Sequence, residues 1–305
     1  MIDSNYFNQA KVLLEALPFL QKEEVFALKG GTAINFFIRD LPRLSVDIDL
    51  TYLPINERDI AFKDISRSLI NLQNRIEKQS TDIQIILKKH QDPNLVKGLV
   101  LNRAGSIVKI EPNLVIRGSV YKPETKSLSS KTQNLFESYV EVQLLSFADI
   151  YGGKICAALD RQHPRDLFDI YLLLKNEGIT ESIKKAFIVY LISHPRPIVE
   201  ILNPNFIKIK DIYEKEFKGL SDETIDCSEL EDTREVLVSA INKSLDQADR
   251  NFILSVKQGE PDWDLLEVQR IEKLPAVRWK LLNIKKMSKE KHEAALNKLR
   301  DHLGI

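Results

Sequence analysis

Two carboxylates and two glycines lie close together in the stretch KGGTAINFFIRDLPRLSVDIDL, residues 29–50. Asp47 and Asp49 alternate with apolar residues, a pattern typical of a strand that projects both acids from one face. Two carboxylates at this spacing lie about 6–7 Å apart along a strand, and they repel each other unless a cation neutralises them. Carboxylate oxygens suit Mg²⁺, which takes its remaining ligands from water and substrate phosphates. The stretch therefore predicts metal-assisted chemistry on a phosphorylated substrate.

The glycine pair Gly30-Gly31 precedes these acids and strengthens the functional interpretation. An Asp-x-Asp pattern also occurs by chance on surface strands, so it has little value alone. Two glycines at a turn let a phosphate approach the backbone, and N–H groups at a helix start can hold it. Thr32 is expected to cap a short helix over residues 33–38.

Two further polar residues, Arg43 and Ser45, come just before the acidic strand. Arg43 could neutralise charge on a bound nucleotide, and Ser45 could donate a hydrogen bond to a phosphate oxygen. A surface role explains either residue equally well. The sequence contains no Walker motif, so the glycine pair is not a P-loop.

Hydrophobic periodicity predicts an α+β domain followed by a helical domain. Helices are expected over residues 8–20 and 57–78, and Pro112 is expected to break the strand that begins at Ser106. The expected strands cover residues 26–28, 45–50, 83–87, 98–101, 106–111 and 139–145. The helices expected after them cover residues 147–159, 165–174 and 181–193. The predicted domains are therefore 1–147 and 148–305.

Composition limits the classes of function. The 305 residues carry 44 Lys and Arg against 44 Asp and Glu, so the chain cannot bind nucleic acid by bulk charge. No stretch approaches 18 consecutive apolar residues, which predicts no membrane-spanning helix. The chain has only two cysteines, too few for a disulfide framework, which fits a reducing, cytoplasmic location.

Charge is nevertheless distributed unevenly along the second half. Residues 211–235 hold ten acidic and three basic residues, and residues 270–300 hold ten basic and three acidic ones. Two solvated surfaces that face one another would explain this pattern. Alternatively, the basic segment, which contains Trp279, contacts phosphates of RNA.

The order of these motifs resembles the nucleotidyltransferase superfamily related to DNA polymerase β. The narrower pattern, Gly-Gly-Thr-Ala at 30–33 followed by Arg-x-Ser-x-Asp-x-Asp at 43–49, looks like the AbiEii/AbiGii toxin family. These are nucleotidyltransferase-like toxins of type IV toxin–antitoxin and abortive-infection systems, with the mycobacterial MenT toxins as relatives. The resemblance implies a mixed sheet with helices in the N-terminal domain and a helical C-terminal domain.

The same resemblance assigns roles to residues outside the first motif. Glu111 would be the third carboxylate of a metal set formed with Asp47 and Asp49, and Asp82 and Glu141 are substitutes if the strand order differs. Physically, a third acid could complete a metal site or deprotonate an attacking hydroxyl.

A second segment, YGGKICAALDRQHPRDLFDIYLL at 151–173, resembles the family's lysine followed by an Arg-Asp-x-x-Asp helix start. By this resemblance, Lys154 and Asp166 belong to the active-site group. Lys154 could place a charge on the triphosphate, whereas Asp166 could hold Lys154 or Arg161 in place. For Asp169, the helix macrodipole is at least as good an explanation.

The function implied by the resemblance is transfer of a nucleoside monophosphate from an NTP to an acceptor hydroxyl. The cofactor would be Mg²⁺, with Mn²⁺ as an alternative, and the acceptor would be RNA, with the 3′ end of tRNA as the leading candidate. A toxin also implies a cognate antitoxin encoded nearby, which in type IV systems need not bind the toxin. A protein hydroxyl as acceptor, a metal-dependent nuclease and a non-catalytic binding module remain alternatives at this point.

Overall fold

A computed structural model describes residues 3–221 and 225–305, and the chain divides into two compact units. The first unit comprises Met1–Ser146 and Phe217–Thr224, and the second comprises Phe147–Glu216 and Ile225–Ile305. The first division lies one residue from the predicted boundary at 147. The return of 217–224 to the first unit was not predicted from the sequence.

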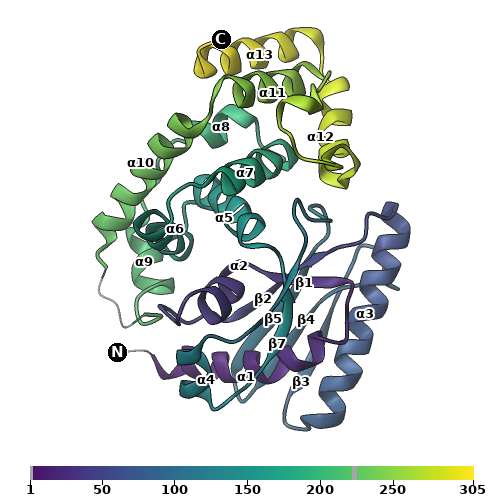
Figure 1. Ribbon diagram of the computed structural model, residues 1–305. Helices are drawn as coiled ribbons and strands as arrows, with labels where there is room; N and C mark the ends of the chain where they lie inside the picture. The colour runs from purple at the N-terminus through teal and green to yellow at the C-terminus, as the bar shows by residue number, and fades with distance from the viewer. Residues whose placement is uncertain (1–2, 222–224) are drawn as a thin grey trace. The chain divides into compact units, whose positions relative to one another are not determined.

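The first unit contains a seven-stranded mixed sheet with the order β3-β4-β5-β2-β1-β7-β6 (Figure 1). Strand β2 pairs in parallel with β5 and antiparallel with β1, which places it near the centre of the sheet. The strands are β1 (Phe26–Lys29), β2 (Asp47–Tyr52), β3 (Gln84–Lys89), β4 (Val96–Arg103), β5 (Ser106–Asn113), β6 (Glu124–Ser127) and β7 (Glu141–Leu144).

Two amphipathic helices, α1 (Ser4–Leu20) and α3 (Arg58–Gln79), contact the sheet and each other. Asp3 caps α1, because its carboxylate accepts a hydrogen bond from the Asn5 N–H at 2.7 Å. The core between helices and sheet is apolar, with fully buried residues that include Leu13, Leu17, Leu28, Leu50, Ile65 and Leu69. A shorter helix, α4 (Ser130–Phe136), and strand β6 were not predicted from the sequence.

The predicted helix after the glycine pair begins earlier than expected. A helical turn α2 (Gly30–Thr32) leads directly into a π-helix η1 (Ala33–Ile38), so Thr32 is inside the helix and does not cap it. Its hydroxyl instead lies 2.6 Å from the Asp47 carbonyl oxygen, to which it donates. The expectation that Thr32 is an N-cap was therefore wrong.

Pro112 does not break its strand, contrary to the sequence-based expectation. Strand β5 continues through Pro112 to Asn113, both paired with β2. The pairing of β5 with β4 ends at Ile110, so Pro112 has a neighbouring strand on one side only. A proline lacks the N–H needed for a second ladder bond, and such a one-sided position tolerates it.

The second unit is helical, as predicted, and its described residues include no strand. Its helices are α5 (Phe147–Arg161), α6 (Pro164–Asn176), α7 (Glu181–Ser193), α8 (Ile198–Leu202), α9 (Lys210–Glu216), α10 (Cys227–Ser244), α11 (Gln247–Gln258), α12 (Pro275–Lys285) and α13 (Lys289–Leu303), with short turns at η2 (Trp263–Leu265) and η3 (Ile271–Lys273). Together with the mixed sheet, this confirms the predicted α+β fold class. Over the residues described, no helix combines the length and apolarity that crossing a bilayer requires.

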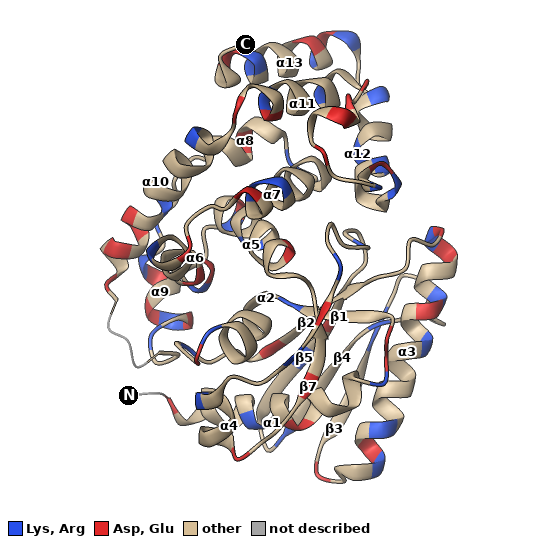
Figure 2. Ribbon diagram, viewed as in Figure 1, with Lys and Arg blue, Asp and Glu red and all other residues tan. Residues whose placement is uncertain are grey.

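The acidic and basic segments lie on different helices. Figure 1 places α9 and the beginning of α10 on one side of the second unit and α12 on the other, and Figure 2 shows their charges. The acidic segment also includes residues 222–224, which lie outside the described part. Residues 217–221 of the acidic segment belong to the first unit, so only the parts on α9, α10, α12 and α13 can be compared within the second unit. That the two charged surfaces face one another stays a prediction.

Candidate active site

The acidic strand β2 presents two different faces. Ile48 and Leu50 are buried in the core, whereas Asp47 and Asp49 alternate with them and are half-buried on the opposite face. This arrangement follows from the two-residue period of a strand. Both carboxylates therefore lie on one face of a central strand, as the sequence predicts.

The glycine turn lies directly against the second of these acids. Lys29, at the end of β1, pairs with Asp49 in β2, so Gly30 begins beside this aspartate. Gly30 has a positive φ of 70°, and a Cβ atom there would lie 2.5 Å from Asp49 Oδ2. Only glycine combines this backbone conformation with so close an approach.

Gly31 makes the corresponding close approach to the loop before β2. A Cβ atom at Gly31 would lie 2.8 Å from Arg43 Nη2 and 3.1 Å from Ser45 Oγ. Arg43 is only 3% exposed, and its guanidinium donates to the Leu44 carbonyl at 2.8 Å. This contact fixes the loop so that the Arg43 guanidinium and the Ser45 hydroxyl lie at the glycine turn.

Thr32 links the glycine turn to the strand on the other side of this loop. Its Oγ1 lies 2.8 Å from Ser45 Oγ, and it donates to the Asp47 carbonyl as described above. Thr32 has no exposed surface, so it positions Ser45 and β2. The structure therefore brings together seven of the predicted site residues in the first unit: Gly30, Gly31, Thr32, Arg43, Ser45, Asp47 and Asp49.

Strand order distinguishes among the three candidates for the third acid. Glu111 lies on β5, directly opposite Asp49 in the parallel register with β2. Glu141 lies on β7, which is separated from β2 by β1. Asp82 precedes β3, which lies beyond β4 and β5, and it pairs with Arg103 at 2.8 Å. Glu111 is thus the candidate on a strand adjacent to the acidic pair.

The Glu111 carboxylate is engaged by Lys88 of β3 at 2.5 Å, and its side chain is 45% exposed. Over residues 3–221 and 225–305, no group of three or more His, Cys, Asp or Glu side chains is arranged to hold a metal ion. Register therefore places Glu111 beside Asp49, while its side chain contacts a lysine. The metal set of Asp47, Asp49 and Glu111 stays a prediction.

The second predicted motif forms a buried ion cluster between α5 and α6. Lys154 Nζ lies 2.7 Å from Asp166 and 3.0 Å from Asp169, and all three side chains are at most 5% exposed. Arg161 adds a second cation on Asp166 at 2.5 Å. The cluster joins the two helices through the buried charges of Lys154, Asp166 and Asp169, with the exposed Arg161 at its edge.

The electrostatics of this cluster favour charged carboxylates. Burial alone would raise the pKa of Asp166, but the charges of Lys154 and Arg161 outweigh burial and hold that pKa well below its usual value. The observed contacts agree with a positioning role for Asp166. The catalytic roles of Lys154 and Asp166 stay predictions, as does the predicted contribution of the helical domain to the site.

Two residues that contact these groups, Lys88 and Asn35, were not recognised from the sequence, and the role of a third, Asp169, was left open. Asp169 is a partner of Lys154 and has 0% exposure, whereas the helix-dipole explanation implies an exposed acid. Lys88 depends on strand pairing, which no local pattern reveals. Asn35 donates to the Gly31 carbonyl at 2.9 Å, and its position within the apolar run 33–38 was an available signal.

Comparison with protein families identifies the chain. A family model described as "Nucleotidyl transferase AbiEii toxin, Type IV TA system" matches residues 12–283. The chain belongs to this AbiEii family. Membership covers both motifs described above, and it makes the protein a nucleotidyltransferase of the toxin–antitoxin class.

A solved structure supports the same fold for this AbiEii-family chain. The chain resembles the solved structure of "MenT4, nucleotidyltransferase toxin Rv2826c from Mycobacterium tuberculosis H37Rv" with a TM-score of 0.58 and 12% sequence identity. The similarity covers 97% of this chain and 95% of the other. At this identity the similarity shows the fold alone. A comparison with curated protein sequences found no match.

Proposed function

We propose that this protein transfers a nucleoside monophosphate from an NTP to an acceptor hydroxyl of RNA in a Mg²⁺-dependent reaction. The observation that carries the proposal is the glycine turn, where Gly30 touches Asp49 and Gly31 touches Arg43 and Ser45. One short segment thus combines backbone N–H groups, a cation and a hydroxyl with two carboxylates. A nucleotide triphosphate needs both kinds of group, because its phosphates are anionic and its metal ions are cationic.

The carboxylates fit a hard divalent cation by donor chemistry, and strand register supports their grouping. Asp47 and Asp49 share one face of β2, and Glu111 is opposite Asp49 on β5. These three residues would hold Mg²⁺, or Mn²⁺ as the alternative, through oxygen ligands. When bound there, the ion would supply Lewis-acid chemistry, which would favour attack by the acceptor hydroxyl and departure of pyrophosphate.

The neighbouring residues would bind and orient the nucleotide. The Gly30-Gly31 backbone would lie against the phosphates, with the Ser45 hydroxyl donating to a phosphate oxygen. Arg43, held by the Leu44 carbonyl, would supply a fixed positive charge beside them. Thr32 would keep Ser45 and β2 in register through its two contacts.

For the acceptor, we favour RNA and, within RNA, the 3′ end of tRNA. Support comes from the basic segment 270–300, most of which lies on α12 and α13, with Trp279 54% exposed. Exposed cations beside an exposed aromatic ring suit phosphates and unstacked bases. Modified tRNA would block translation in the cytoplasm, which accounts for growth inhibition and abortive infection. The cognate antitoxin of such a system can counter the effect without binding the toxin.

The decisive experiment incubates the protein with labelled NTPs, Mg²⁺ and total cellular RNA and protein. We expect label in a tRNA-sized band with the wild-type protein and none with the Asp47→Asn/Asp49→Asn variant. Asp59→Asn is the matched control, because Asp59 is an exposed acid on α3 of the same unit. Omitting Mg²⁺ and replacing it with Mn²⁺ tests the choice of ion.

Other outcomes would contradict parts of the proposal. A labelled protein band keeps the chemistry and replaces the acceptor by a protein hydroxyl. RNA fragments without transferred label, formed without NTP, would identify a metal-dependent nuclease. Growth inhibition by the double Asn variant equal to that of the wild type would indicate a non-catalytic binding module.

A further inference from the structure

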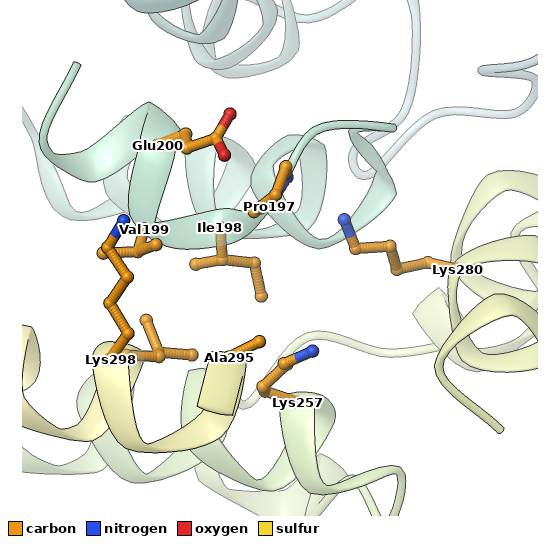
Figure 3. A pocket seen from close by; sticks show the side chains of 9 residues that line it. Pro197, Ile198, Val199, Glu200, Lys257, Lys280, Ala295 and Lys298 are labelled. Carbon is orange, nitrogen blue, oxygen red and sulfur yellow. The ribbon is translucent and has the colours of Figure 1, made fainter. Parts of the chain in front are cut away.

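A small cavity of about 150 Å³ lies within the second unit, and no residue of either sequence motif lines it. Its walls come from α8 and the residue before it, and from α11, α12 and α13 (Figure 3). The apolar part of the lining is formed by Pro197, Ile198, Val199, Ala295 and Leu299. A cavity of this size holds about five water molecules and is smaller than the roughly 300–1,000 Å³ of sites for drug-sized ligands.

Three lysines on three different helices line this cavity: Lys257 on α11, Lys280 on α12 and Lys298 on α13. Figure 3 shows Lys280 and Lys298 extending toward α8 from different sides, with Lys257 below the apolar wall. Glu200 is the single acidic residue of the lining. The lining therefore has an excess of positive charge.

The two more buried lysines lack a negatively charged partner. Lys257 is only 9% exposed, and its ammonium donates a hydrogen bond to the Met287 sulfur at 3.5 Å. Lys280 donates to the carbonyl oxygens of His194 at 2.7 Å and Arg196 at 2.6 Å. In the part of the chain that the structure describes, neither forms an ion pair with a carboxylate.

Buried ammonium groups without an anion are unfavourable, since burial removes water that a neutral or weak partner does not replace. Burial lowers the pKa of Lys257. Burial, together with the positive charge of Lys257, lowers the pKa of Lys280 to about 8. An anion bound between them would supply the missing partner.

We propose that this cavity, named here the three-lysine pocket, binds a phosphate group through Lys257, Lys280 and Lys298. Lysine is a point-charge ligand for phosphate. Lys298 is exposed and extends from a different side than Lys280 (Figure 3), and its flexible four-carbon stem lets its ammonium turn toward a phosphate held by Lys257 and Lys280. The volume admits one phosphate group and excludes a whole nucleotide. The apolar wall removes competing water, which strengthens the interaction between charges. This site lies outside the proposed transferase chemistry and does not depend on it.

The test uses the full chain and inorganic phosphate, titrated by calorimetry against chloride at constant ionic strength, without NTP. We expect one phosphate per chain that binds in the wild type and is lost in the lysine variants, in addition to any that binds at the glycine turn of the first unit. Lys257→Met preserves side-chain length and removes the charge, so we expect affinity to fall about tenfold or more. Lys298→Met changes an exposed side chain with little risk to folding, and it should also weaken binding.

Two matched variants locate the bound phosphate. Lys285→Met, on the exposed part of α12, should bind phosphate as the wild type does. The Asp47→Asn/Asp49→Asn variant should also bind as the wild type does, because its changes lie in the first unit. Melting temperature in phosphate gives a second readout: the phosphate-induced rise seen in the wild type should disappear in Lys257→Met.

A single-stranded RNA probe distinguishes the two sources of a phosphate group. If Lys257→Met and Lys298→Met weaken RNA binding and inorganic phosphate competes with RNA, the ligand is an RNA phosphate. If RNA binding is unchanged while phosphate binding is lost, the ligand is free phosphate or a small phosphate ester. Both results support the three-lysine pocket.

Two results would overturn the proposal. One is the absence of measurable phosphate binding by the wild-type protein. The other is unchanged phosphate affinity in both Lys257→Met and Lys298→Met, which would place the phosphate elsewhere. Neither result bears on nucleotidyl transfer, which is measured separately with labelled NTPs.

Discussion

Acidic side chains occupy two contrasting environments in this protein. In the second unit, Asp166 and Asp169 are buried against Lys154 at 2.7 and 3.0 Å. In the first unit, Asp47 and Asp49 are half-buried on one face of the central strand β2. Their neighbour Glu111 shares its strand register but pairs with Lys88. Buried, ion-paired charges join helices, whereas like charges kept together on a sheet suit a bound cation.

The largest effect on stability should come from removing the lysine of the buried cluster. Lys154→Met leaves two buried carboxylates without their shared cation, which costs about 3–5 kcal/mol in unfolding free energy. Urea unfolding measures this loss. Lys243→Met, an exposed lysine on α10, is the control and should change stability by less than about 0.5 kcal/mol. Equal urea midpoints for the two variants would contradict a stabilising role for the cluster.

The second-largest effect on stability should come from acid, which weakens the buried cluster. The pKa of Asp166 in the folded protein lies below its usual value of 3.8. The ionised carboxylate therefore contributes its full stability above that value, and this contribution is lost as the pH falls toward the folded pKa. We expect the unfolding free energy to decline below about pH 4, with a shallower decline in Asp166→Asn. Parallel pH profiles for the two proteins would show that Asp166 has no such linkage.

A smaller effect is expected at the glycine turn. Gly30→Ala combines a positive φ with a Cβ atom 2.5 Å from Asp49 Oδ2, and it should cost about 1–3 kcal/mol. Gly105→Ala is a close match, because Gly105 has φ 87° and no atom within 4 Å of the added Cβ. Both variants should lose stability, but only Gly30→Ala should lose transfer activity, since it displaces Asp49. Equal transfer activities of Gly30→Ala and Gly105→Ala would show that the position of Asp49 does not affect the reaction.

The smallest effect on stability should come from Asp49, a proposed metal ligand. Asp49→Asn removes one of two like charges on β2 and leaves no buried charge unpaired, so stability should change by less than about 0.5 kcal/mol. Transfer of labelled nucleotide should fall about a hundredfold or more. Strong destabilisation of Asp49→Asn would show that Asp49 stabilises the fold, as Asp166 and Asp169 of α6 do.

Local patterns in the sequence predicted which residues of the first-unit candidate site lie together, because they all fall within residues 29–50. The period of two in β2 and the conformational freedom of glycine depend on neighbours along the chain. Strand boundaries differed by about two residues, as for β2, which begins at Asp47 and was expected at Ser45. Strand β6 was not predicted because residues 124–127 are polar and do not alternate with apolar ones.

Contacts that depend on tertiary pairing were not accessible from the sequence. The Lys88–Glu111 ion pair requires the register of β3, β4 and β5. Asp169 was judged by its position near a helix start, yet its partner Lys154 lies on the preceding helix. The helical nature of residues 148–305 was predicted, but the three-lysine pocket depends on how α8, α11, α12 and α13 pack.

The segment 217–221 belongs to the first unit and contacts the loop that carries Arg43 and Ser45. The Leu44 N–H donates to the Leu220 carbonyl at 2.7 Å, and the Ser221 hydroxyl donates to the Pro42 carbonyl at 2.7 Å. During synthesis, these two hydrogen bonds cannot form until residue 221 has emerged from the ribosome. At about 5–20 residues per second, the delay after Asp47 is roughly 9–35 s. If this loop binds the nucleotide as proposed, a nascent chain that ends before the segment would lack these two bonds and would be inactive until synthesis has passed residue 221.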